Sequence, residues 1–163
     1  MKKTSNTPDI QSKDDEYVLM SLTYISRNNT RNSGIALARI LEKVRRKLEE
    51  NNMTSVLAIN DNYFFQTIEG SRPLINKLLA NLINDDRRHQ EFRIIDIQEI
   101  DHRKWQGFTI KYLTSAAKEK DLVFKHFSEG MDFNPYLRNQ KQILSFINTL
   151  FEEEYGACRV EKH

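Results

Sequence analysis

The feature that most constrains the fold is a pair of short strand-like segments, MTSVLAI (53–59) and YFFQTIEG (63–70), separated only by NDN. Two apolar segments around a short polar turn predict a β-hairpin. Alternate side chains of the second segment share a face, Phe64, Gln66 and Ile68 on one and Tyr63, Phe65, Thr67 and Glu69 on the other. Because both faces carry large apolar side chains, we expect the sheet to be covered on both sides.

The segments around this hairpin alternate between strand and helix patterns. We expect strands over 17–26, 91–100 and 106–113, helices over 35–52 and 71–86, and two further helices over 115–130 and 134–154. This order predicts an α+β fold, a ferredoxin-like βαββαββ sheet with two helices on one face and the two C-terminal helices capping the other. A stripe of Leu37, Leu41, Val44 and Leu48 in the first helix would face the core.

The length of 163 residues suits one domain with a modest appendage. We expect a flexible tail over 1–15, the βαββαββ domain over 16–114, a helical cap over 115–155 and a tail over 156–163.

Composition excludes several classes of function. The 25 basic and 23 acidic residues are interspersed, which argues against direct binding of nucleic acid. Without an apolar run of about 20 residues we expect no membrane span and a cytoplasmic protein. The single cysteine, Cys158, and four histidines show no metal-ligand spacing, and no phosphate loop or nucleophile motif occurs. We therefore expect neither a metal nor an enzyme.

Gln66 is out of place between Phe64 and Ile68, because a buried amide needs hydrogen-bond partners. In the predicted topology the first and third strands are central neighbours, so Tyr24 of the first strand can meet Gln66 beneath the two helices. Such a pair can serve packing alone or can take part in a function.

The segments LTYIS, TSVLAINDNYFFQTIEG and DDRRH together resemble the BLUF domain, a sensor of blue light that uses FAD. The resemblance covers about residues 17–113. It implies a flavin bound between the two helices, with Tyr24 as electron donor, Gln66 as a hydrogen-bond switch and Ser26 beside them. Arg88 and His89 would lie near the pyrimidine side of the flavin ring.

In the family, the switch is read out at the fifth strand, where this chain has Trp105, Phe108 and Ile110. The chain departs from the family pattern at the flavin site. Leu48 stands where the family has an asparagine that holds the polar edge of the ring, and Asn51 and Asn52 would lie about one turn further on, outside the pocket or on the trailing loop.

Further departures lie nearby. Met53 and Ser55 replace the isoleucine and glycine of the family's Ile-Thr-Gly motif, and Asn81 stands where relatives often carry a basic or histidine side chain. An unpaired polar ring edge costs about 1–3 kcal/mol for each missing bond, so we expect weakened flavin binding.

Two functions remain open. The first is a small BLUF-type photoreceptor that binds FAD non-covalently and signals through contacts with an unidentified protein, such as a transcriptional or signalling regulator, or with another copy of itself. The second is a flavin-free BLUF-like module for protein interaction or regulation. Retention of Tyr24 and Gln66 favours the first, and Leu48 favours the second.

Overall fold

The computed structural model describes residues 18–28, 34–60, 62–84, 92–113 and 134–160. The expected N-terminal tail and the expected helix over 115–130 lie outside these residues.

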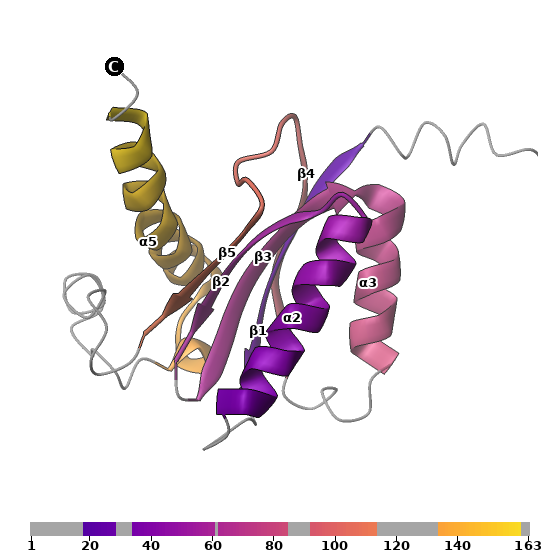
Figure 1. Ribbon diagram of the computed structural model, residues 1–163, viewed down its shortest axis with the longest axis horizontal. Coiled ribbons are helices and arrows are strands. Elements are labelled where there is room, and N and C mark those ends of the chain that lie inside the picture. The colour runs from indigo at the N-terminus through magenta and orange to yellow at the C-terminus, as the bar shows by residue number, and fades with distance from the viewer. Residues whose placement is uncertain (1–17, 29–33, 61, 85–91, 114–133, 161–163) are drawn as a thin grey trace, which may run out of the picture.

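A five-stranded sheet forms the centre of the molecule (Figure 1). Its strands are β1 (Leu19–Arg27), β2 (Thr54–Ile59), β3 (Tyr63–Ser71), β4 (Arg93–Ile100) and β5 (Phe108–Tyr112). The spatial order is β4-β1-β3-β2-β5, in which β2 and β5 are parallel and the other neighbours antiparallel. The predicted hairpin and the central position of β1 and β3 are confirmed.

Helices α2 (Gly34–Glu50) and α3 (Arg72–Asn84) cover one face of this sheet. The expected stripe of α2 is confirmed, because Leu41 and Leu48 are buried and Leu37 and Val44 pack against the apolar clusters beneath them. The ferredoxin-like α+β fold is therefore present.

Helix α2 ends two residues earlier than expected. Asn52 has a positive φ of 52°, a conformation that asparagine tolerates better than most residues. The backbone N–H of Asn52 donates to the Glu49 carbonyl at 3.1 Å, and that of Met53 donates to the Leu48 carbonyl at 2.9 Å. This paired hydrogen-bond pattern terminates a helix and redirects the chain, here into β2.

The C-terminal region differs from expectation at both ends. A short 3-10 helix (Pro135–Leu137) comes first, and α5 (Gln140–Val160) follows. Asn139 starts α5 with a capping box: its Oδ1 accepts from the Gln142 N–H at 2.9 Å, and Gln142 Oε1 accepts from the Asn139 N–H at 3.0 Å. Helix α5 continues through residues 156–160, the start of the segment expected above as a tail, and no proline interrupts it there.

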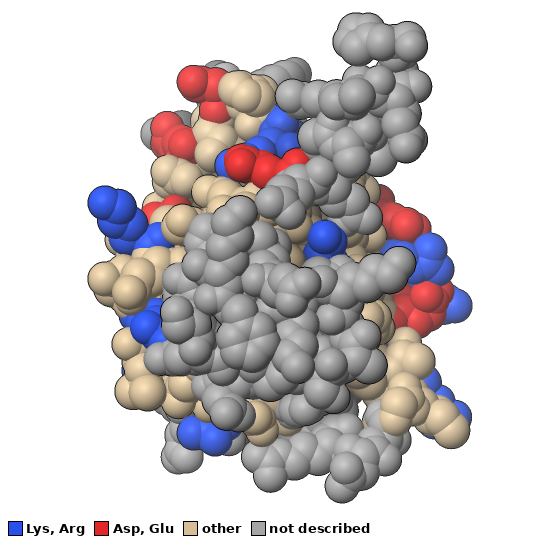
Figure 2. All heavy atoms as spheres, turned by 90° about the vertical axis from the view of Figure 1, so that its left-hand side faces the viewer, with Lys and Arg blue, Asp and Glu red and all other residues tan. Residues whose placement is uncertain are grey.

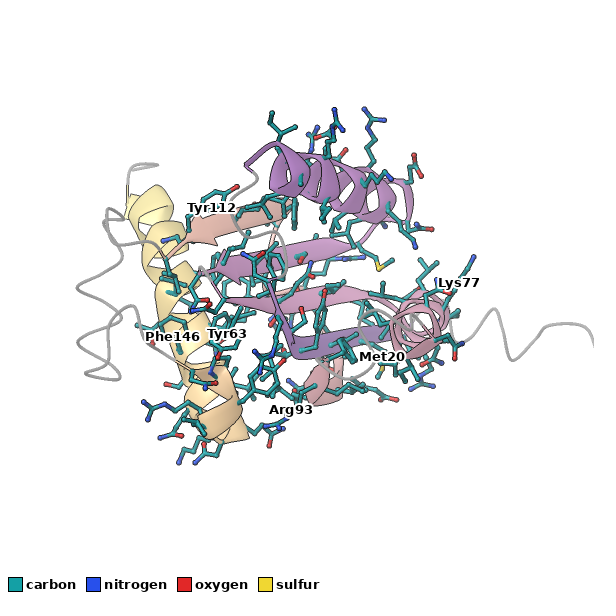
Figure 3. The ribbon with its side chains drawn as sticks, turned by 90° about the horizontal axis from the view of Figure 1, so that it is seen from below. Met20, Tyr63, Lys77, Arg93, Tyr112 and Phe146 are labelled. Atoms are coloured by element: carbon teal, nitrogen blue, oxygen red, sulfur yellow. The ribbon has the colours of Figure 1, made fainter. Side chains whose placement is uncertain are left out.

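Helix α5 covers the opposite face of the sheet from α2 and α3 (Figure 3). Five of its residues, Ile143, Phe146, Ile147, Leu150 and Phe151, join one buried cluster with side chains of the strands. The cluster includes Phe65 of β3, which points away from Gln66 as the strand alternation predicts. Both faces are thus covered, one by α2 and α3 and the other by α5.

Within the described residues, no helix is both long and apolar enough to span a bilayer. On the face shown in Figure 2, acidic and basic side chains of the described residues are intermixed.

Candidate functional site

Tyr24 and Gln66 face each other across the two central strands. They are direct partners in the antiparallel register of β1 and β3, and both are buried, with exposed fractions of 8% and 3%. The Tyr24 hydroxyl donates a hydrogen bond to Gln66 Oε1. The ring of Phe92 lies against Tyr24, with centroids 4.9 Å apart.

The other end of the Gln66 amide is bound by a serine of the next strand. Gln66 Nε2 donates to Ser55 Oγ at 2.9 Å. Ser55 is fully buried on β2, where it pairs with Ile68, two pairs along from the Leu57–Gln66 pair. Tyr24, Gln66 and Ser55 therefore form a hydrogen-bonded row across three adjacent strands.

An interhelical cavity of about 370 Å³ lies above this row, between α2 and α3. Tyr24, Gln66 and Ile68 form part of its floor. Its aliphatic wall is made by Val44, Leu48, Leu74, Leu78 and Leu82. Such a space accepts a flat apolar ring and presents it to the phenol and the amide.

The remaining lining of the interhelical cavity is polar or positively charged. Lys43 and Lys47 come from α2 and Lys77 from α3, where Figure 3 shows it extending outward. Three ammonium groups around one opening favour a ligand that carries negative charge, such as a phosphate.

Two asparagines also line the cavity, Asn51 beside α2 and Asn81 on α3. Asn51 lies on the loop that trails α2, one of the two places expected for it, and from there it lines the cavity. Because α2 ends at Glu50, Asn51 sits in the turn, and its Nδ2 donates to the Lys47 carbonyl at 2.7 Å. That bond holds the asparagine against the end of the helix beside the cavity.

The other predicted site residues divide into three groups. Leu48 is buried and forms part of the cavity wall, where the sequence places it. Ser26 follows Tyr24 on the same face of β1 but does not line the cavity. Arg88 and His89 lie outside the described residues.

Among the residues expected to receive the signal, Trp105 packs on the opposite face of the sheet from Phe108 and Ile110. Phe108 and Ile110 lie on β5 and pack in the clusters beneath α2. Trp105 precedes β5 and packs on the α5 face, with its ring centroid 6.0 Å from that of Phe151. Trp105 is three positions before Phe108 and five before Ile110, odd offsets that would put it on the opposite face if strand alternation extended back beyond β5.

Glu69 is a buried carboxylate on the α5 face of β3, and its sequence context predicted no role for it. Its Oε1 accepts from the Trp105 N–H at 2.9 Å and from the Thr54 hydroxyl at 3.2 Å, and its Oε2 accepts from the Lys104 N–H at 3.0 Å. Glu69 thereby fixes the segment that leads into β5. Glu69 lies four positions after Phe65 on the same covered face of the strand, and a carboxylate buried there needs hydrogen-bond donors.

Within the described residues no group of three or more histidine, cysteine or carboxylate side chains is placed to hold a metal ion. The candidate functional site therefore consists of the hydrogen-bonded row and the interhelical cavity above it.

Fold and site together define a small α+β ligand-binding domain with a phenol–amide pair at the floor of its cavity. The family model described as "Sensors of blue-light using FAD", the BLUF model, matches residues 19–111, which is more than half of the chain. This protein therefore belongs to the BLUF family.

Several solved structures, among them a BLUF protein, have a similar fold. The photo-activated state of BlsA is 28% identical with a TM-score of 0.64, and the alignment covers 81% of this chain and 94% of BlsA. BlrB in its dark state is 21% identical with a TM-score of 0.57, covering 84% of this chain and 97% of BlrB. A bacterial light-regulated adenylyl cyclase is 19% identical with a TM-score of 0.54, and the match covers 88% of this chain but 36% of that protein. A search of curated proteins found no match.

Proposed function

We propose that this protein is a blue-light photoreceptor that binds FAD non-covalently in the interhelical cavity. The observation that carries the proposal is the Tyr24–Gln66 hydrogen bond at the floor of a cavity bounded by α2 and α3. The protein would signal through changed contacts with a protein partner, without catalysing a reaction itself.

The chemistry of the cavity lining suits most parts of a flavin nucleotide. A volume of about 370 Å³ falls in the usual range for small-molecule sites. The aliphatic wall suits the faces of a fused aromatic ring, and Lys43, Lys47 and Lys77 suit its phosphates. The poor fit is at Leu48, which offers no hydrogen bond to a polar ring edge.

Flavin, when bound, absorbs blue light and in its excited state accepts an electron and a proton. Tyr24 is placed to supply both, because its phenol lines the cavity and an oxidisable phenol can give up an electron from its ring and the proton from its hydroxyl. Losing this proton removes the donor that holds Gln66 Oε1. With that bond lost and the one to Ser55 remaining, the amide can turn, and turning exchanges its accepting and donating ends. Tyr24 would recover its electron and its hydroxyl proton when the dark state returns.

A second function, a flavin-free interaction module, is favoured by one specific observation. The Gln66 amide is bonded at both its oxygen and its nitrogen by Tyr24 and Ser55. The site therefore satisfies its own buried polar groups without a ligand, and Leu48 adds an apolar wall.

Equilibrium titration with FAD distinguishes the two functions. We expect a saturable change in flavin fluorescence, and a variant with the cavity floor altered, Ile68→Trp, should bind at least about tenfold more weakly because its larger ring occupies the cavity. Protein that remains colourless after incubation with excess FAD would overturn the photoreceptor proposal.

A further inference from the structure

We infer that Ser55 is a positioning residue that holds the Gln66 amide in either of two orientations and connects it to the start of β5. This inference rests on the proposed function, because it concerns control of the Tyr24–Gln66 pair.

The position of β2 gives Ser55 this role. In the sheet order, β2 lies between β3, which carries Gln66, and β5. The Ser55 side chain accepts from Gln66 Nε2 at 2.9 Å. Its backbone N–H donates to the carbonyl of Gly107 at 2.8 Å, immediately before β5. One residue thus contacts the amide through its side chain and the segment entering β5 through its main chain.

The chemistry of the hydroxyl allows Ser55 to serve both orientations. In the observed one, Tyr24 donates to Gln66 Oε1, and Gln66 Nε2 donates to Ser55. After a half-turn of the amide, Nε2 can donate to the Tyr24 oxygen, while the Ser55 hydroxyl donates to Oε1. A hydroxyl both donates and accepts, so no polar atom of the amide loses its partner in either state.

Halfway through the rotation the amide points at neither hydroxyl. Ser55 therefore stabilises both end states more than the state between them, which slows their exchange. A glycine, which the family pattern has at this position, offers no side chain for this purpose. Because Ser55 is fully buried, water does not readily replace its hydroxyl.

The test compares Ser55→Ala with Ser21→Ala. Ser21 is a buried serine on β1 that pairs with Glu69 and faces away from the amide, so its substitution removes the same hydroxyl from the opposite side of the sheet. In flavin-free protein, NMR of the Gln66 side-chain NH₂ should show an upfield shift of the bonded proton in Ser55→Ala. Its exchange with solvent should become at least about tenfold faster. Ser21→Ala should leave both quantities unchanged.

The second measurement uses protein loaded with FAD. After a blue-light pulse, the dark spectrum of Ser55→Ala should return about tenfold faster than that of the unaltered protein, as expected for the loss of one hydrogen bond from the starting state. If Ser55→Ala does not fold, Ser55→Cys replaces it, and its weaker S–H group predicts changes in the same direction but smaller.

Unchanged Gln66 NH₂ signals in Ser55→Ala would overturn the inference, and so would unchanged dark recovery in loaded protein. Failure of every version to bind FAD would overturn the proposed function instead. The NMR comparison would still decide whether Ser55 holds Gln66.

Discussion

Leu48 gives the interhelical cavity an aliphatic side chain at the position where an amide would hold the polar edge of a ring. Its exposed fraction is 3%, and it packs with Met53, Ile68 and Leu82 as well as lining the cavity. The same side chain therefore supports the core and weakens the site for a ligand with polar edges.

Replacing Leu48 by asparagine should increase the affinity for FAD and lower the free energy of unfolding. We expect FAD to bind Leu48→Asn about ten- to a hundredfold more tightly, since each recovered hydrogen bond is worth about 1–3 kcal/mol. Without ligand the variant should lose about 1–3 kcal/mol in its free energy of unfolding, because the new amide lies in an apolar wall. Fluorescence titration and urea unfolding measure the two effects.

Val44→Asn is the matched control, because it places the same amide on the same wall one helical turn earlier. We expect no gain in affinity from it. Equal gains in the two variants, or none in Leu48→Asn, would show that position 48 does not face the polar edge of the ring.

Glu69 holds three donors of the segments beside β3, and its exposed fraction is 2%. Glu69→Gln should lower the free energy of unfolding by about 2 kcal/mol, because an amide nitrogen would then face the N–H of Lys104 or Trp105. Chemical denaturation measures this change.

Glu99→Gln is the comparison for Glu69→Gln. Glu99 forms a salt bridge with Arg72 but its side chain is 65% exposed, so the loss should be at most about 1 kcal/mol. A Glu69→Gln protein as stable as Glu99→Gln would contradict the role given to the buried carboxylate.

At the level of elements, α5 is the cover that the second face of the sheet requires. Phe146 is fully buried, and its ring centroid lies 5.9 Å from that of Phe65 on β3. Phe146→Ala should cost about 3–5 kcal/mol of unfolding free energy, the usual range for an aromatic side chain removed from a core. Denaturant unfolding followed by circular dichroism measures it.

Leu137→Ala serves as the control for this prediction, because Leu137 is 81% exposed in the 3-10 helix before α5. It should change stability by no more than about 0.5 kcal/mol. A similarly small loss for Phe146→Ala would mean that α5 does not pack on the sheet in solution.

The sheet and its covering helices could be read from the sequence because the apolar periodicity agrees with the fold over most of its length. Both central strands alternate as predicted, and Leu41 and Leu48 fall where the α2 stripe puts them. The end of α2 depends on the left-handed conformation of Asn52, which composition alone does not specify. The start of α5 was predictable from Asn139 and Gln142, since their spacing is that of a capping box.

The candidate site was only partly predictable. The Tyr24–Gln66 pair follows from strand order, because alternation fixes which side chains share a face. The cavity itself depends on the separation of α2 and α3, and the contact of Ser55 depends on hairpin register. No local sequence pattern sets the separation of the helices, and the register follows from the type of turn that NDN adopts, which its three residues do not specify alone. Asn51 lines the cavity for the same reason, since its position follows from where α2 ends.

At the level of the whole molecule, Asp96 links stability to pH. Burial raises the pKa of its carboxyl above the ordinary value of 3.8, and the hydrogen bond from Gln140 opposes that rise. The folded protein thus binds this proton more tightly than the unfolded chain does. Protonated Asp96 therefore contributes to the free energy of unfolding. The whole contribution is present below pH 3.8, the pKa in the unfolded chain, and it is lost as pH rises through the higher pKa of the folded protein.

In Asp96→Asn the free energy of unfolding should no longer fall as pH rises on account of this side chain, because the side chain is then neutral at every pH. Gln140→Ala should make the decrease larger, because the bond that favours the charged form is gone. Urea unfolding from about pH 3 to about pH 6 follows both variants. The same pH profile in all three proteins would contradict this account of Asp96.

In the proposed function, Tyr24 and Gln66 form a light-driven switch beneath a bound flavin. The most direct measurement is the light-minus-dark absorption spectrum of the FAD-loaded protein, recorded beside Gln66→Leu loaded to the same occupancy. We expect a reversible shift of the flavin band to the red in the unaltered protein and no such shift in Gln66→Leu. A loaded protein whose band does not move under blue light, or a Gln66→Leu variant that shifts equally, would contradict the claim.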